Sequence, residues 1–586
     1  MHPPLPRPAA AGRGPPDAAA VPASAARRRP AAFLAALLAA SCAAQAAVPP
    51  PDAGQVQRQA ERALSPPDAT PPPSEAAHRD RGGEAGPAFV VQRFVVEGAT
   101  LLPPDALQRV LAPWRGRPLR FSDLQAALRQ VVALYRDHGW FARAQLPEQD
   151  ITEGTVVVQV VEGRFGRLGV RDSGGRADGD FIAAMVGRGL RPGEPYALAA
   201  LERGLLLAND LPGVAVDGVL QAGQAPGTSD LVLHVDDRPL LGGSIAVGND
   251  GSRYTGRAQA IARVTLDNPG GYGDQLSATA MRGEALEYVG ASYATPLGAS
   301  GLRGTLGYTW LHYRLGKEFA LLEATGASRL QRAGLSYPLR RSEAWNLEVE
   351  LAGARRWQED ASLGEQLRRR RLQDLTVSLF GDAVDGRGGG GHTAWILDLA
   401  RGRTRLELPE DRLLDAVGPG VQGGFTLTRL ELRHDRWLDR NWYLRTRMNG
   451  QWSTGNLDSS LQFALGGPSG VRGYPVNEAT GDSGAVLQLE LHRLLSTPGN
   501  GELDGYVFLD GGTIRQRQDP WGESPVNRYG LAAAGVGLRW TLGGFAASLA
   551  LGAPLGDNPG GLDGDNQDGT RPAPQLWFNL RRQFPR

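Results

Sequence analysis

Residues 442–452 read WYLRTRMNGQW, and the polarity of their side chains alternates along most of the segment. Trp442, Leu444 and Met448 share one face of an extended chain, because successive side chains of a β-strand point to opposite sides. The other face takes Tyr443, Arg445, Arg447, Asn449 and Gln451. The segment therefore predicts a strand that separates an apolar environment from a strongly polar one.

The same alternation recurs in VLQLELH (486–492) and VGLRWTL (536–542), and from about residue 240 onward helical periodicity fades. Alternation alone also fits a sheet with one face in water. Two features favour a transmembrane β-barrel. Strands of about nine to eleven residues carry many charges on their polar face, and the apolar face often ends in an aromatic residue. Only a closed barrel lets strands cross lipid without unpaired edges.

The size of this region predicts about 16 antiparallel strands, since about 340 residues are available at about 20 to 22 per strand and connection. An even number keeps both chain ends on the periplasmic side. The connections also fit an outer-membrane barrel, because the short turn 542–544 alternates with the long segments 515–530 and 556–574. The last predicted strand, 575–584, ends on Phe584.

Two smaller modules precede the predicted barrel. Residues 89–166 have the pattern of a strand, two helices and two further strands, and residues 167–238 repeat that order. Such a repeat of about 75 residues predicts two successive β-α-α-β-β domains of the α+β class.

The first 88 residues have the features of an exported protein. A basic flank, an apolar run over 31–40 and the small-x-small triplet 44–46 predict a signal peptide over 1–46. A lipoprotein signal that ends at Cys42 is an alternative, although Ala39 stands where a larger aliphatic residue is usual. The segment 47–88 then predicts a helix over 52–64, followed by a Pro-rich linker.

The composition excludes several classes of function. The formal net charge of +1 gives no basic field for nucleic acid. Cys42 is the only cysteine, so the mature chain is predicted to lack disulfides, thiolate metal sites and a cysteine nucleophile. No metal-binding histidine motif, phosphate-binding loop or catalytic constellation is recognisable, so we expect no cofactor and no enzyme.

Two further segments resemble functional motifs only in part. GDSG at 481–484 resembles the nucleophile stretch of trypsin-like proteases, but it lacks recognisable histidine and aspartate partner motifs, and a hairpin turn is the better interpretation. The acidic segment 562–569 lacks the spacing of an EF-hand and is interpreted as an external loop, with weak calcium binding as an alternative.

The candidate site lies in GGPSGVRGYPV (466–476), in the long loop between predicted barrel strands 11 and 12. A turn needs glycine and proline, but it does not need Arg472 or Tyr474. One strand further on, Asp510 lies among apolar residues, and a carboxylate facing lipid would cost several kcal/mol. We therefore expect Asp510 to face the lumen and to pair with Arg472 on an inward-folding loop. Water in the lumen would screen such a pair, which would then act by positioning the loop. In the alternative interpretation, Arg472 is a solvated loop arginine and water is the partner of Asp510.

These residues resemble a known superfamily of outer-membrane transporters and insertases, which join periplasmic POTRA domains to a 16-stranded barrel. The matching residues are Val471, Arg472, Gly473 and Tyr474 in the loop, with Phe508, Asp510 and Gly512 on the barrel wall. Residues 139–165 and 205–223 resemble the ends of the two POTRA domains of two-partner secretion transporters, the hemolysin secretion/activation family. The resemblance covers the chain from about Gln55 to Phe584.

The resemblance implies a function and a division of labour. The POTRA domains (89–166 and 167–238) would capture an unfolded exoprotein in the periplasm by strand addition, and the barrel (239–586) would release it at the cell surface. The helix in 47–88 would occupy the pore at rest, and the pair formed by Arg472 and Asp510 would hold the transport-competent arrangement. Lipid and the barrel-assembly machinery are the other implied partners.

Two alternatives remain at this stage. One is an insertase for other membrane proteins on the same scaffold, and the other is a general diffusion porin, which the repeated modules disfavour. Whether the exoprotein is an adhesin, cytolysin, protease or growth inhibitor stays open.

Overall fold

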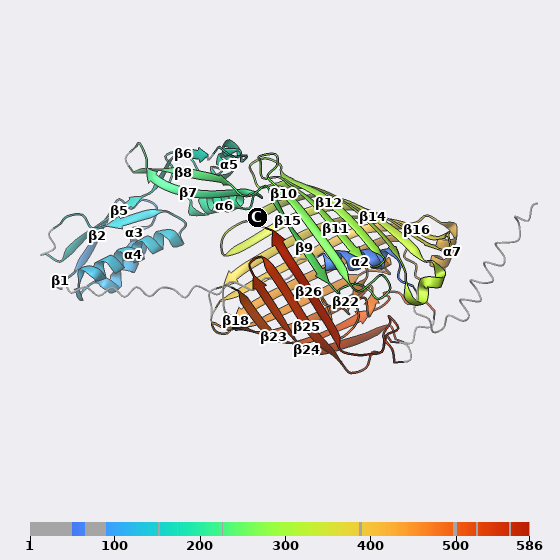
Figure 1. Cartoon of the computed structure of the whole chain (residues 1–586). Coiled ribbons are helices and arrows are strands. Elements are labelled where there is room, and N and C mark those ends of the chain that lie inside the picture. The colour runs from blue at the N-terminus through green and yellow to red at the C-terminus, as the bar shows by residue number, and fades with distance from the viewer. Residues whose placement is uncertain are drawn as a thin grey trace, which may run out of the picture. The chain divides into compact units, whose positions relative to one another are not determined.

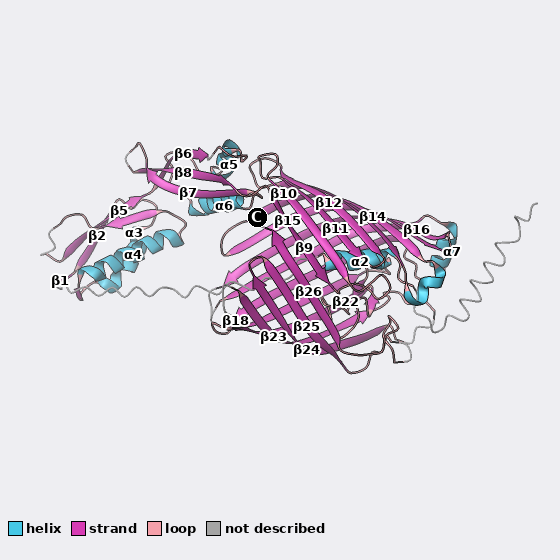
Figure 2. Ribbon diagram, viewed as in Figure 1, coloured by secondary structure: helices cyan, strands magenta, loops and turns pink. Residues whose placement is uncertain are grey.

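A computed structural model describes residues 50–64, 89–149, 153–172, 174–225, 227–385, 390–495, 501–522, 526–561 and 564–584 (Figures 1 and 2). The predicted signal peptide, the predicted linker after residue 64 and the first two residues of the acidic segment 562–569 lie outside the described residues. None of the described helices is long and apolar enough to span a membrane.

Sixteen antiparallel strands of the described residues form a closed barrel, which confirms the predicted fold. Its strands are β9 (Leu241–Gly248), β10 (Gln259–Asp267), β11 (Gln275–Gly283), β12 (Leu286–Pro296), β13 (Arg303–Arg314), β14 (Thr325–Arg340), β15 (Trp345–Ser362), β16 (Glu365–Asp385), β17 (Gly391–Leu406), β18 (Gly423–Trp437), β19 (Trp442–Ser453), β22 (Ser483–Leu495), β23 (Glu502–Arg515), β24 (Arg528–Leu542), β25 (Phe545–Leu555) and β26 (Gln575–Phe584). The barrel closes where β26 pairs with β9, from Asn579 opposite Gly248 to Phe584 opposite Gly243.

The two faces of the barrel wall differ as the alternation predicts. Leu509, Val536 and Leu576 point outward and are 51%, 54% and 53% exposed. On β19, by contrast, Tyr443 and Arg445 point inward and are fully buried. The outward face is therefore apolar where it meets lipid, and the inward face carries the charges.

The strands β14 to β17 are 16, 18, 21 and 16 residues long. The estimate of nine to eleven residues per strand is wrong for this part of the wall. Charged side chains continue on the outward face beyond the apolar band, so the hydrogen-bonded ladder extends past the membrane here.

The two α+β modules have separate cores. In the first, β2 (Arg93–Glu97) pairs in parallel with β5 (Thr155–Glu162), and β5 pairs antiparallel with β4 (Ala142–Gln145). The helices α3 (Pro104–Leu111) and α4 (Phe121–Asp137) bury their apolar faces in the same core. This module also contains η1 (Ala112–Trp114), β1 (Phe89–Val90) and β3 (Pro118–Leu119).

The second module repeats that plan. Its central strand β8 (Thr228–Asp237) lies between β6 (Arg164–Asp172) and β7 (Val214–Ala222). The helices α5 (Gly179–Val186) and α6 (Leu198–Asn209) contribute to its core.

The predicted N-terminal helix is α2 (Ala53–Ala63), with Asp52 as its N-cap. Figure 1 draws it in blue among the barrel strands. Its small side chains Ala53, Val56 and Ala60 are buried against inward-facing barrel residues that include Met281. The helix therefore lies in the lumen, where this apolar stripe fits against one side of the wall.

The remaining described elements lie in the connections between barrel strands. They are η2 (Lys317–Leu322), α7 (Pro409–Ala416), η3 (Ser459–Leu461), β20 (Phe463–Ala464) and β21 (Thr480–Gly481).

Candidate functional site

The loop 454–482, between β19 and β22, folds back into the barrel and is held against its wall. Val471 and Tyr474 are 0% and 1% exposed and belong to an apolar cluster that includes residues of the barrel strands. A Cβ added to Gly473 would lie 2.8 Å from the Cβ of Ala533 on β24. A glycine is therefore needed where the loop lies this close to the wall.

Arg472 lies against Asp510 of β23 with the geometry of a guanidinium fork. The Nε–H of Arg472 donates to Oδ2 of Asp510 at 2.8 Å, and Nη2 donates to Oδ1 at 2.6 Å. The backbone N–H of Arg472 adds a third bond to Oδ2 at 3.0 Å. The Phe508 ring lies beneath the guanidinium, with its centroid 3.6 Å from Cζ. A Cβ on Gly512 would lie 2.7 Å from Leu465 of the loop, so this glycine leaves room for the loop.

The pair is shielded from water, which differs from the screened pair that the sequence suggested. The side chains of Arg472 and Asp510 are 4% and 0% exposed, because the loop covers them. In such a place, removing one partner leaves an uncompensated charge and costs about 3 to 5 kcal/mol. Burial by itself lowers the pKa of Arg472, but the hydrogen bonds of Asp510 and the charge of Glu490 outweigh it and raise that pKa.

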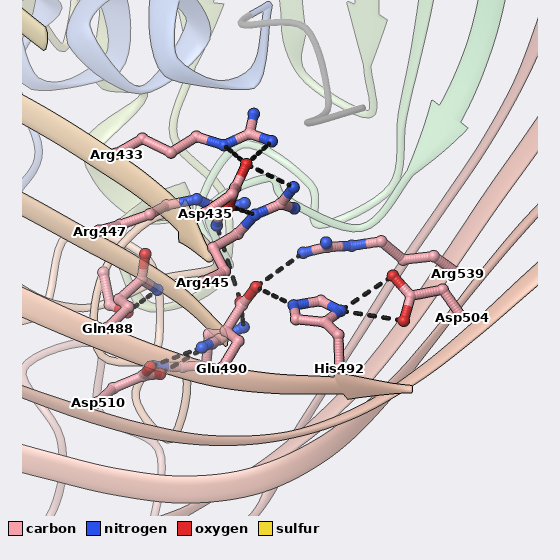
Figure 3. A network of polar contacts seen from close by, with 12 residues as sticks. Arg433, Asp435, Arg445, Arg447, Gln488, Glu490, His492, Asp504, Asp510 and Arg539 are labelled. Carbon is pink, nitrogen blue, oxygen red and sulfur yellow. Dashed lines mark hydrogen bonds and ion pairs between the residues drawn. The ribbon is translucent and has the colours of Figure 1, made fainter. Parts of the chain in front are cut away.

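Glu490 of β22 is the centre of the polar contacts around Arg472. It accepts hydrogen bonds from Nη1 of Arg472 and, at 3.1 Å, from Nη2 of Arg539. Nε2 of His492 lies 2.9 Å from Oε2 of Glu490, the oxygen that also accepts from Arg539, and Nδ1 of His492 lies 2.9 Å from Asp504. Figure 3 shows Arg539 and His492 converging on Glu490, with Asp504 on the far side of the imidazole. Three neighbouring strands therefore share one chain of charges.

Two tyrosines enclose His492. Its ring stacks on Tyr443 at 4.3 Å between centroids and on Tyr506 at 4.8 Å. The hydroxyl of Tyr443 donates to Asp504 at 2.6 Å. These contacts fix the imidazole in position on the lumenal face of β22.

A second charged group lies nearby on β18 and β19. Asp435 is fully buried and accepts from Nε of Arg445 at 2.6 Å and from Nη2 of Arg433 at 2.6 Å (Figure 3). Arg433 and Arg445 share this one carboxylate, so the lumenal wall can bury Asp435 with its charge compensated.

The helix α2 is anchored at its N-terminus by Asp52. This carboxylate accepts from the hydroxyl of Ser459 at 2.6 Å and lies 3.3 Å from the guanidinium nitrogens of Arg368 and Arg370. Burial by itself raises the pKa of Asp52, but the charges of Arg370 and Arg368 outweigh it and hold that pKa below its usual value.

The same helix rests on the loop that carries Arg472. Nη1 of Arg58 donates to the carbonyl of Gln462 at 2.9 Å and also to the carbonyl of Ser459. A Cβ on Gly54 would lie 2.6 Å from the backbone nitrogen of Ser460, so the first turn of α2 packs directly on η3. The helix and the loop are thus in contact over several residues.

The sequence did not identify Glu490, His492 and Asp504 as members of the site. Alternation placed Glu490 and His492 on the polar face of their strand, but nothing in the sequence marked them as partners of Arg472. The seven residues singled out in the loop and on the barrel wall do come together: Val471, Arg472, Gly473, Tyr474, Phe508, Asp510 and Gly512. Their role in transport stays a prediction. Among the described residues, no group of three or more His, Cys, Asp or Glu side chains could hold a metal ion.

Comparison with known proteins decides the family. The model of the haemolysin secretion/activation protein ShlB/FhaC/HecB family matches residues 227–540, and that of the ShlB-type POTRA domain matches residues 89–163. The chain belongs to the ShlB/FhaC/HecB family.

Individual relatives agree with this assignment. The outer membrane transporter CdiB of Escherichia coli O6:K15:H31 (strain 536 / UPEC) is 29% identical over 545 residues, which cover 86% of this chain and 84% of CdiB. The heme/hemopexin transporter protein HuxB of Haemophilus influenzae (strain 86-028NP) is 26% identical over 490 residues, which cover 82% and 84%. The solved structure of CdiB from Escherichia coli superposes with a TM-score of 0.66 at 23% identity, over 92% of this chain and 100% of the other.

As a member of the ShlB/FhaC/HecB family, the protein is an outer-membrane transporter of two-partner secretion and not an enzyme. It transports a partner exoprotein, and its POTRA region lies in the periplasm. The charges around Arg472 therefore belong to the wall of a protein-conducting barrel.

Proposed function

We propose that α2 and the Arg472 loop are the two gating parts of this transporter, and that the arriving exoprotein displaces α2 from the lumen. The observation that carries this proposal is that one loop makes both sets of contacts. Its residues 459–462 hold α2, and Arg472 of the same loop holds the wall. Displacing α2 therefore frees one side of the loop while the other side stays fixed.

The space in the lumen suits an unfolded chain. A cavity of about 1730 Å³ is lined by charged residues of α2, such as Arg58 and Glu61, and by wall residues that include Glu431 and Arg447. An unfolded polypeptide needs hydrogen-bond partners for its backbone, and a polar, hydrated cavity supplies them. Since α2 lines this space, its departure enlarges the route for an exoprotein.

The Arg472–Asp510 pair positions the loop in this scheme. It keeps the loop on β23 while α2 moves, so the passage widens on the side of α2 and the loop does not swing freely. The buried fork, with its three hydrogen bonds to Asp510, gives the rigidity that this role needs.

In the periplasm, the exoprotein adds a strand to a free sheet edge of the POTRA region. Among the described strands, β7 pairs with β8 alone, and Val219 on it is 44% exposed. An unfolded exoprotein segment can continue this sheet through backbone hydrogen bonds. The working domains are residues 89–166, 167–238 and 239–586, and the exoprotein is of the haemolysin type for which the family is named. Lipid and the barrel-assembly machinery are the further partners.

Trapping α2 tests the proposal. The hydroxyl of Ser328 on β14 donates to the side-chain oxygen of Gln57 on α2. In a Gln57→Cys/Ser328→Cys variant, a short reducible thiol cross-linker ties the helix to the wall. Secretion of the partner exoprotein is then expected to stop and to recover after reduction.

The matched control joins two strands and leaves α2 free. Ser277 of β11 and Ser292 of β12 have their hydroxyl oxygens 2.8 Å apart, so Ser277→Cys/Ser292→Cys accepts the same cross-linker. This variant should secrete normally. Normal secretion with α2 cross-linked refutes the proposal. If loss of the protein instead stops the assembly of unrelated outer-membrane proteins, the insertase reading takes its place.

A further inference from the structure

The outward face of the barrel carries a concentration of arginines on β14 to β17. The register aligns outward positions of β14 to β17 in rows that cross the four strands. One row contains Arg355 opposite Gln373, and Gln373 opposite Arg403. The neighbouring rows add Arg401, which pairs with Leu375, and Arg405. We name five of the outward arginines of these rows the arginine belt, leaving out Arg371, which has a carboxylate partner. The belt consists of Arg329, Arg355, Arg401, Arg403 and Arg405.

These side chains point away from the lumen. Leu375 and Val377 of β16 face outward and are 55% and 39% exposed. Gln373 lies on the same face of β16 as Leu375 and Val377, because it is two residues before Leu375. Its partner Arg403 on β17 is exposed as well. The belt thus continues the lipid-facing surface and does not line the transport route.

The height of the belt places it at the boundary between hydrocarbon and headgroups. On β16 the outward positions from Leu375 to Ala383 are all apolar or glycine. At about 3.3 Å per residue and a strand tilt of about 40°, this segment rises about 20 Å, close to the lipid-facing band of an outer-membrane barrel. The chain enters the barrel from the periplasm at β9, so β16 runs toward the periplasm and the belt lies at the external edge of the band, where Arg401 pairs with Leu375.

The belt has few charges to balance it. Within the described residues, Arg329, Arg401, Arg403 and Arg405 form no ion pair, whereas Arg371 in the same rows pairs with Glu407. On the opposite wall, outward positions such as Leu509 and Val536 are apolar, and outward arginines occur at the strand ends. A group of unpaired, exposed guanidiniums at headgroup level calls for an anionic partner in the membrane itself.

An apolar groove descends from the belt. It has a volume of about 690 Å³ and runs over the outside of β11 to β16. Leu306, Tyr308, Ala333 and Gly353 line it, and Arg355 of the belt borders it together with the polar residues Gln331 and Gln373. A Cβ added to Gly353 would meet nothing within 4 Å, so the glycine leaves open space on the wall.

We propose that this part of the barrel binds a phosphorylated glycolipid of the outer leaflet. The belt holds the phosphate groups through bidentate guanidinium contacts, and the groove takes an acyl chain. One molecule with phosphates at headgroup height and acyl chains below them fits both features, which lie next to each other. The site goes beyond transport itself, because it lies on the membrane side of the wall.

Binding of bisphosphorylated lipid A to the purified full-length protein tests the proposal, with native mass spectrometry as the readout. The test variant is Arg355→Gln/Arg403→Gln. Its matched control is Arg528→Gln/Arg582→Gln, which removes two arginines from strand ends of the opposite wall. We expect affinity about tenfold weaker in the test variant and within about twofold of wild type in the control. Both should retain the barrel, which the heat-modifiable migration of the protein on gels reports.

The groove is tested separately by Gly353→Leu, which fills it, with Gly505→Leu on β23 as control. A Cβ on Gly505 would make only ordinary contacts, at 3.5 Å from Leu495. Gly353→Leu should weaken lipid A binding, and Gly505→Leu should not.

Competition experiments identify which kind of phosphate-bearing molecule the site binds. Inorganic phosphate and phosphatidylglycerol, at the same phosphate concentration, should compete poorly with lipid A. Wild-type affinity in the Arg355/Arg403 variant, or an equal loss in its control, overturns the proposal. Full competition by inorganic phosphate or by phosphatidylglycerol also overturns it, because the site would then not be specific for the glycolipid.

Discussion

In the proposed gating scheme, the contact of Arg58 with the loop sets how firmly α2 closes the lumen. Replacing Arg58 with methionine keeps most of the apolar stem and removes the guanidinium, so the carbonyls of Ser459 and Gln462 lose a charged donor. Each hydrogen bond to a charged group contributes about 1.5 to 3 kcal/mol. After subtracting the desolvation of the guanidinium, which is buried only while α2 is in place, we expect a net loss of about 2 kcal/mol. That loss raises the ratio of open to closed channels about 30-fold.

Single-channel recording in planar lipid bilayers measures this ratio directly, as the fraction of time that the channel conducts. The matched control is Arg62→Met in the same helix. Arg62 makes one longer hydrogen bond, 3.4 Å to the carbonyl of Ala464, and lies over the Phe463 ring, so we expect an increase below about fivefold. An open fraction of Arg58→Met equal to wild type, or no larger than that of Arg62→Met, refutes the reasoning.

Three further predictions follow from buried polar groups. Arg472→Ala and Asp510→Ala should each destabilise the loop in its position against the wall by about 3 to 5 kcal/mol and stop secretion while the barrel still assembles. Exchanging the two residues should restore part of the secretion. Normal secretion by both single variants contradicts the positioning role. Burial of Glu478 in the loop raises its pKa to about 7. The pKa of Glu478 is higher in the folded loop than in the unfolded chain. Its contribution to the stability of the folded loop is therefore complete at acid pH and is lost as pH rises from about 5 to 8. Limited proteolysis of the loop should become faster over that range in wild type but not in Glu478→Gln, and a flat wild-type profile would count against this. In the first POTRA module, burial by itself raises the pKa of Glu162, but hydrogen bonds from two backbone N–H groups and two hydroxyls outweigh it and lower that pKa. Glu162→Gln should therefore lower the free energy of unfolding of this module by about 2 kcal/mol above pH 5, and by less as pH falls below the usual carboxyl pKa. Thermal unfolding of the full-length protein measures this. A first transition at pH 7 that is the same in the variant as in wild type contradicts the prediction.

The alternation of residues 442–452 predicted the barrel only together with the many charges on the polar face and the aromatic ends of the apolar face, because lipid and lumen impose opposite demands on successive side chains. The inward position of Asp510 followed from the cost of a charge in lipid. Neither argument predicts the contacts of Glu490 with His492 and Arg539. Those contacts depend on the register between strands and on side-chain rotamers, and sequence spacing specifies neither.

The contacts of α2 were even less accessible from the sequence. Its N-cap Asp52 was recognisable, but the partners Arg368 and Arg370 lie more than 300 residues away. They sit in a run of four arginines, Arg368–Arg371, in which inward and outward side chains alternate. Only the three-dimensional structure separates the two that face the helix from the two that face the outside.

The pairing of β26 with β9 has a consequence for how the protein is made. It joins residues about 330 apart along the chain, such as Gly248 and Asn579, and closing so long a loop costs about 5 kcal/mol of chain entropy before any hydrogen bond at the seam forms. Until β26 arrives, both terminal strands present unpaired backbone groups, which lipid cannot satisfy. Membrane insertion and completion of the last strand are therefore coupled, so a chain truncated before residue 575 should accumulate in the periplasm as a substrate for proteases.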